Sequence, residues 1–120
     1  MRIIKNTSVY QTRKLKNLFG MVHYLIAIRE GRLRTWKQLR VLVRNGRNSG
    51  HAYLSVGGSW REFDMCVSVG TDLEGICQLF AHELMHNYGY HHRQFRRDPL
   101  DQDQIERIKR EICMTAEELK

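Results

Sequence analysis

The chain has 120 residues, of which 42% are hydrophobic, and these values predict one domain over residues 1–120 with a single modest core. Its 20 Lys and Arg outnumber its 13 Asp and Glu, which leaves a formal net charge of +7. This balance suits a polyanionic partner such as nucleic acid, but a soluble basic surface explains it equally well. No apolar run is long enough to span a bilayer, so no membrane partner is expected.

The first part of the chain predicts a long helix. A short strand through Ile3 and Ile4 is followed by Ser8, which can cap a helix over residues 9–30. Gly31 is expected to end this helix. Its apolar residues recur with helical spacing and predict a buried stripe, formed by Leu15, Leu18, Phe19, Val22, Leu25 and Ile26.

The location of the protein is inferred from this helix and from the cysteines. Basic residues precede the apolar run 18–28, an order that also occurs in secretion signals. His23 and Tyr24 interrupt the run and no small-residue cleavage site follows, so a core helix is favoured. The cysteines at 66, 77 and 113 are odd in number and lack metal-pair spacing. We therefore expect buried free thiols and a cytoplasmic protein.

The middle of the chain predicts a small sheet. Apolar and polar side chains alternate over 38–44 and 60–69, and residues 51–56 form a further strand between two turn sequences. The turns contain Asn45-Gly46 and Gly57-Gly58. Because such short connections favour hairpins, the prediction is an antiparallel sheet of three strands, or of four with the strand at the start of the chain.

The next helix carries a metal-binding pattern. Thr71 and Glu74 match a capping box and predict a helix over 72–88. Within it lies HExxH, in which His82 and His86 are four residues apart and therefore share one face. Both imidazoles can reach one metal ion. Glu83 lies beside that face, where a general base for water is required.

The pattern continues to HExxHxxGxxH. Gly89 can adopt a left-handed conformation and turn the chain back, which would bring His92 to the metal as the third ligand. His91 is an alternative for this position, and so is Glu106 or Glu111 from the last helix. Three protein ligands leave a fourth position for water, as is typical of catalytic sites, and imidazoles suit zinc.

The C-terminal part predicts a basic segment and a final helix. Residues 93–97 surround Phe95 with basic side chains, which suits either phosphate binding with base stacking or a solvated loop with Phe95 packed inward. Asp98 and Pro99 are expected to start a helix that ends near Met114.

The sequence resembles two families of proteins. His82, Glu83, His86, Gly89 and His92 match the extended zinc motif of the metzincin metalloproteases. The expected order of helix, three short strands, metal helix and final helix is also similar to the minimal zincins of the SprT-like group. The resemblance implies an α+β zincin fold in which three histidines hold Zn²⁺ and the glutamate acts as base. SprT-like proteins are associated with DNA-bound substrates, so it also implies substrates that are bound to nucleic acid.

These observations favour a zinc-dependent metallopeptidase that cleaves a protein or peptide substrate, and an endopeptidase rather than an exopeptidase. Tyr88, Tyr90 or His91 are candidates for stabilising the oxyanion. The alternative is a zinc-stabilised nucleic-acid-binding or protein-interaction module without hydrolytic activity. The sequence leaves the oligomeric state open.

Overall fold

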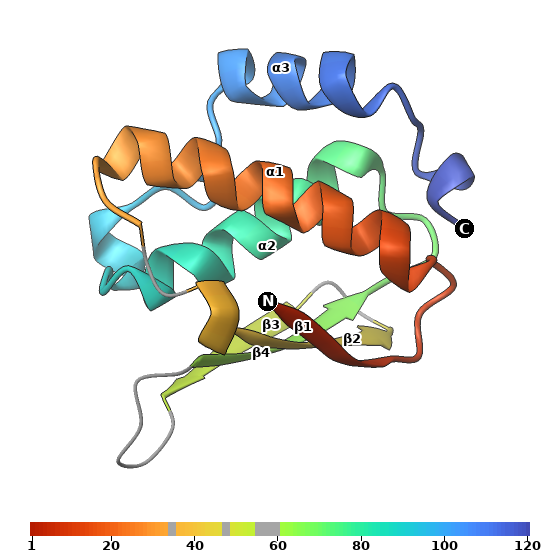
Figure 1. Ribbon diagram of the computed structural model, residues 1–120, viewed down its shortest axis with the longest axis horizontal. Coiled ribbons are helices and arrows are strands. Elements are labelled where there is room, and N and C mark those ends of the chain that lie inside the picture. Colours follow the sequence, from red (N-terminus) through yellow and green to blue (C-terminus); the bar gives the residue numbers. More distant parts are fainter. Residues whose placement is uncertain (34–35, 47–48, 55–60) are drawn as a thin grey trace.

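The computed structural model describes residues 1–33, 36–46, 49–54 and 61–120 of an α+β fold (Figure 1). A four-stranded sheet lies on one side of the molecule and the helices lie on the other. In chain order the strands and α-helices are β1 (Arg2–Asn6), α1 (Thr12–Glu30), β2 (Arg40–Asn45), β3 (Ser49–Leu54), β4 (Arg61–Val67), α2 (Leu73–Asn87) and α3 (Gln102–Ile112). The described residues also form three short 3-10 helices, η1 (Trp36–Gln38), η2 (His92–Gln94) and η3 (Glu117–Leu119).

The sheet is mixed, so the predicted antiparallel sheet is wrong. Its strand order is β1-β2-β4-β3, in which β1, β2 and β4 are parallel and β3 pairs antiparallel with β4. α1 connects β1 to β2, and a helical crossover of this kind returns the chain to the end of the sheet at which it started. β4 then lies between β2 and β3. The turn at Asn45-Gly46 therefore does not join neighbouring strands, and the backbone N–H of Gly46 instead donates to the Val67 carbonyl of β4 at 3.3 Å.

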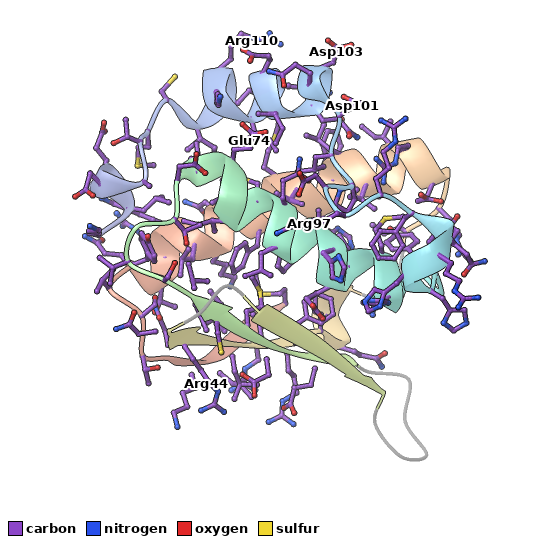
Figure 2. All side chains as sticks on the ribbon, turned by 180° about the vertical axis from the view of Figure 1, so that it is seen from behind. Arg44, Glu74, Arg97, Asp101, Asp103 and Arg110 are labelled. Carbon is purple, nitrogen blue, oxygen red and sulfur yellow. The ribbon has the colours of Figure 1, made fainter. Side chains whose placement is uncertain are left out.

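One face of the sheet packs against the helices and the other is open. The inward residues are fully buried, namely Val41 and Val43 on β2 and Phe63, Met65 and Val67 on β4. The intervening residues point outward. Among them Arg44 pairs with Asp64 at 2.7 Å, on the side of the sheet away from the helices (Figure 2). The alternation of side chains was therefore predicted correctly, and so was the antiparallel pairing of β3 with β4, but the predicted pairing of β2 with β3 is wrong.

Aromatic packing joins the layers of the core. The rings of Phe19 on α1 and Phe80 on α2 stack with centroids 4.2 Å apart, and Phe63 of β4 lies 5.6 Å from Phe80. The predicted stripe of α1 is buried as expected. Of the described helices, none combines the length and hydropathy that crossing a bilayer would require.

Helix starts differ from the prediction by a few residues. α1 begins at Thr12 after Gln11, because the Ser8 hydroxyl instead donates to the Asn6 side chain at 2.6 Å. α2 is capped by Asp72 rather than Thr71, since the Asp72 carboxylate accepts the Gly75 N–H at 2.7 Å. Gly31 ends α1 in a left-handed conformation with φ 69°, as predicted.

The start of α3 and the cysteines also require correction. α3 begins after Asp101, which forms a capping box with Gln104, and not at Asp98-Pro99. Pro99 is buried ahead of the helix. Cys77 is buried as expected, and burial raises the pKa of its thiol to about 12. The cysteine at 66 is partly exposed and the one at 113 is exposed, so buried thiols were predicted correctly only at 77.

Candidate metal centre

Three histidines from two elements meet at one point. His82 and His86 come from α2 and His92 comes from η2, and one ring nitrogen of each lies within 4.8 Å of the others. The ring centroids are 4.9 Å apart for 82 and 86, 5.1 Å for 82 and 92, and 4.5 Å for 86 and 92. Three imidazoles at this separation form a donor set suited to a divalent transition metal.

The other candidates for the third ligand lie outside this cluster. His91 is exposed and serves as the N-cap of η2. On α3, Glu106 accepts a hydrogen bond from Gln102 at 2.7 Å, and Glu111 pairs with Arg107 at 3.2 Å. Among the described residues the structure therefore brings His92, and neither His91 nor these carboxylates, to His82 and His86.

A helix-terminating turn delivers the third histidine. Gly89 has φ 97°, and its N–H donates to the His86 carbonyl at 2.9 Å while the Tyr90 N–H donates to the Met85 carbonyl at 3.1 Å. These two bonds define a Schellman motif, in which a left-handed residue ends a helix and satisfies its last carbonyls. The chain reverses here, and three residues after the glycine it reaches His92.

The turn also orients the imidazole of His86. The Nδ1 atom of this ring lies 2.9 Å from the Tyr90 carbonyl, which can only accept, so Nδ1 carries the proton and Nε2 is left for a metal. Tyr90 is itself held in place, because its hydroxyl donates to the Glu30 carboxylate of α1 at 2.6 Å. Glu30, at the end of α1, thus holds Tyr90, whose carbonyl orients the imidazole of His86.

The environment favours the neutral form of His82. Burial lowers the pKa of this imidazole, and the nearby imidazoles of His86 and His92 lower it further, while a hydrogen bond with the backbone of Arg97 acts in the opposite direction. Since only a deprotonated ring nitrogen can bind a metal, this lowered pKa keeps the ligand available at neutral pH.

Glu83 is a buried carboxylate without a full set of partners. The residue is 1% exposed, and within the described residues its Oε2 atom has no hydrogen-bond partner. Burial raises the pKa of this carboxyl to about 7. A buried carboxylate oxygen without a partner is costly, and none of the described residues supplies a positive or hydrogen-bonding group to Glu83 Oε2. A cation held by the three histidines, together with its water, fits that requirement.

A cavity of about 750 Å³ opens beside the histidines. It runs along α2 and is walled by the segment 92–98, and its lining includes Leu79, His82, Glu83 and His92. Phe95 forms part of the wall, with its ring centroid 5.1 Å from that of His82 and 5.3 Å from that of His86. Phe95 therefore packs inward against the histidines, which was one of the two expectations for this segment.

The two tyrosines proposed for the oxyanion have other roles. The Tyr88 hydroxyl donates to the Arg32 carbonyl at 3.0 Å, and the Tyr90 hydroxyl is bonded to Glu30. Neither tyrosine lines the cavity beside Glu83, and His91 does not line it either. The polar groups that do line it include Arg96 and Arg97, which belong to the basic segment 93–97, and Gln78, which no sequence motif singled out.

Gln78 secures the far end of the segment that carries His92. Its buried side chain donates to the Leu100 carbonyl and accepts the Leu100 N–H, both at 2.9 Å. The side-chain amide of Gln78 therefore forms the same two hydrogen bonds with the Leu100 backbone that the backbone of a neighbouring β-strand would form. The partner is 22 residues away, so no local sequence pattern could have indicated this contact.

Comparisons of the chain with protein-family models, with curated proteins and with solved structures give no match.

Proposed function

We propose that this protein is a zinc-dependent peptidase, with His82, His86 and His92 as metal ligands and Glu83 as general base. One observation carries the proposal: a cluster of three histidines, two of which line the cavity, lies beside the buried Glu83, whose Oε2 atom has no hydrogen-bond partner among the described residues. A purely structural zinc site is normally closed by four protein ligands and has no use for such a carboxylate. This difference favours the peptidase over the zinc-stabilised binding module.

Each residue of the site has a task in peptide hydrolysis. When bound, zinc supplies a Lewis acid that polarises the peptide carbonyl and makes water acidic near neutral pH, with a pKa of about 7. Glu83 accepts a proton from the attacking water and returns it to the leaving amine. A C–O bond forms and the C–N bond breaks, so the products are a carboxylate and an amine. Phe95 packs against His82 and His86, and the Tyr90 carbonyl orients His86.

Metal content and activity of a single variant test this proposal. Purified protein should contain about one zinc ion per chain, and His86→Ala should lose it. Glu83→Gln should keep the metal. Its cleavage of a peptide mixture, measured by mass spectrometry, should be slower by about 100-fold or more. Glu106→Gln, which alters an exposed carboxylate on α3, is the matched control and should retain activity. Wild-type protein that binds no zinc would refute the metal centre, and full activity of Glu83→Gln would remove the base.

Net charge and the cysteines support a proposal for the substrates and the compartment of this activity. The net charge of +7 supports substrates that are themselves bound to nucleic acid. Free cysteines at 66, 77 and 113 support a reducing, cytoplasmic compartment.

A further inference from the structure

The cavity beside the histidines carries opposite charges at its two ends. Arg96 and Arg97, from the segment after η2, line the part near the metal centre, and Asp72 and Glu74 line the part at the first turn of α2. Figure 2 shows Arg97 against the middle of α2 and Glu74 at its beginning. The cavity therefore has a basic end and an acidic end, and both are charged before any ligand is considered.

The two arginines are available for an anionic group. Both are exposed, and neither has a side-chain ion pair or hydrogen bond with any described residue. Asp98 and Glu83 also line this end, so its net charge before a metal binds is one positive when Glu83 is protonated and zero when Glu83 is ionised. The backbone of Arg97 is hydrogen-bonded with the ring of His82, which fixes this arginine relative to the metal centre. A guanidinium group can bind the carboxylate of an acidic side chain through two parallel hydrogen bonds, as it can a phosphate.

The acidic end is only weakly neutralised. The Asp72 carboxylate caps α2 by accepting the Gly75 N–H at 2.7 Å. Glu74 lies 3.9 Å from Lys109 in a largely exposed pair, which contributes little and can exchange for a cation of a ligand. At the other end of the same cavity, beside His82, the buried Oε2 atom of Glu83 has no hydrogen-bond partner among the described residues.

The separation of the two ends sets a spacing in the ligand. Glu74 and His82 are eight residues apart on α2, which corresponds to roughly 12 Å along the helix axis. An extended peptide advances about 3.3 Å per residue, so this distance spans about three or four residues. We propose that the cavity selects peptide segments with an acidic side chain next to the bond at the metal centre and a basic side chain about three or four residues away. The cleavage rests on the proposed function, whereas the selective binding does not.

A peptide fits this cavity better than a nucleic acid does. A phosphate backbone repeats negative charge at every nucleotide, and Asp72 and Glu74 would repel it at one end of the cavity. Base stacking needs an accessible aromatic face, and the ring of Phe95, which packs against His82 and His86, is only partly exposed to the cavity.

Binding to the zinc-loaded Glu83→Gln variant tests the proposal without cleavage. Short fluorescent alanine-based peptides would carry Asp and Lys about three or four positions apart, with Asp/Asp, Lys/Lys and Gln/Gln peptides as comparisons. The Asp/Lys peptide should bind about 10-fold tighter than Gln/Gln at low salt and lose most of this advantage as salt screens the charges. Equal affinity for all four peptides would overturn the proposal, as would tighter binding of a single-stranded oligonucleotide with a steep salt dependence.

Substitutions in the cavity test which residues recognise the acidic and the basic side chain of the peptide. Arg96→Gln combined with Arg97→Gln should remove the preference for Asp, and Glu74→Gln should weaken the preference for Lys. Arg93→Gln is the matched control, because this arginine lies on the same exposed segment but does not line the cavity. A preference that survives the double variant, or that Arg93→Gln removes equally, would place the selectivity elsewhere.

The two proposals fail in different ways. If the wild-type protein cleaves no peptide but the Asp/Lys preference is present, only the peptidase proposal fails. If the wild-type protein cleaves peptides without regard to their charge, only the selectivity proposal fails.

Discussion

Substitution of glycine by alanine should have opposite effects on stability at Gly89 and at Gly20. Gly89 has φ 97°, which a side chain strains, whereas Gly20 lies within α1, and an added Cβ would meet no atom within 4 Å at either position. Backbone conformation alone therefore decides the result. Gly89→Ala should lower the free energy of unfolding by about 1 kcal/mol, and Gly20→Ala should raise it by about 0.5–1 kcal/mol.

Urea denaturation of both variants measures these changes. Zinc affinity should also fall in Gly89→Ala, because the strained turn precedes His92, and should stay unchanged in Gly20→Ala. Equal effects of the two substitutions would contradict the role assigned to the turn.

His23 predicts a pH dependence of stability that is separate from the metal centre. This residue of α1 is 6% exposed, and burial lowers the pKa of its imidazole to about 4 from the usual 6.5. Below pH 6.5 the imidazole of His23 takes up a proton in the unfolded chain but not in the folded chain. The stability that neutral His23 contributes to the folded state is therefore fully present above pH 6.5 and is lost as the pH falls toward 4. The loss should approach about 3 kcal/mol.

The measurement is urea denaturation between pH 7 and pH 4 with a chelator present, so that metal release does not contribute. His23→Gln should show a flatter profile than the wild type, because the other titrating groups are common to both proteins. Parallel profiles would mean that His23 takes up its proton equally in the folded and unfolded chains.

At the scale of elements, Gln78 anchors the segment between η2 and α3 to α2. Gln78→Leu would leave the buried N–H and carbonyl of Leu100 without their partner, and the expected cost is about 2–4 kcal/mol. Zinc affinity should fall about 10-fold, since the same segment carries His92. Gln102→Leu, which removes an exposed side-chain bond on α3, is the control and should change stability by less than about 0.5 kcal/mol.

Thermal unfolding and hydrogen exchange of the Leu100 amide report this anchor. Rapid exchange at Leu100 is expected in Gln78→Leu only. An amide that stays protected in that variant would show that other contacts hold the segment.

Local patterns predicted α2 and its histidine cluster well because both depend on local geometry. The four-residue spacing of His82 and His86 and the conformational freedom of Gly89 are properties of a few neighbouring residues, and the structure brings His92 to them as expected. The anchors were not predictable in this way. The contacts of Gln78 with Leu100 and of Tyr90 with Glu30 join residues 22 and 60 positions apart, and no periodicity encodes them.

At the scale of the whole molecule, metal binding should be linked to folding. The histidines come from α2 and η2, so the complete donor set exists only in the folded chain. Zinc at 1,000 times its dissociation constant should therefore stabilise the protein by about 4 kcal/mol. The melting temperature should rise with zinc, fall with a chelator, and be insensitive to both in His82→Ala. A wild-type melting temperature that ignores zinc would contradict the site.

The sheet was the least predictable part of the fold. Alternating side chains on β2 and β4 reveal which face is buried, and this was correct, but they carry no information on which strand is the neighbour. The short connections suggested hairpins, while the structure places β4 between β2 and β3. Pairing across the sheet is set by the packing of α1 and α2 over it, which is a property of the assembled domain (Figure 1).

The position of β4 has a consequence for synthesis on the ribosome. β2 and β3 leave the exit tunnel before β4, yet β4 is the only described strand that pairs with β3. Until residue 67 emerges, β1 and β2 of the nascent chain can pair, but the backbone of β3 and the apolar face of β2 stay exposed. Chaperones and neighbouring nascent chains recognise such exposed strands and apolar surfaces. Pausing of translation before this point would therefore prolong the stage at which the chain is most prone to aggregate.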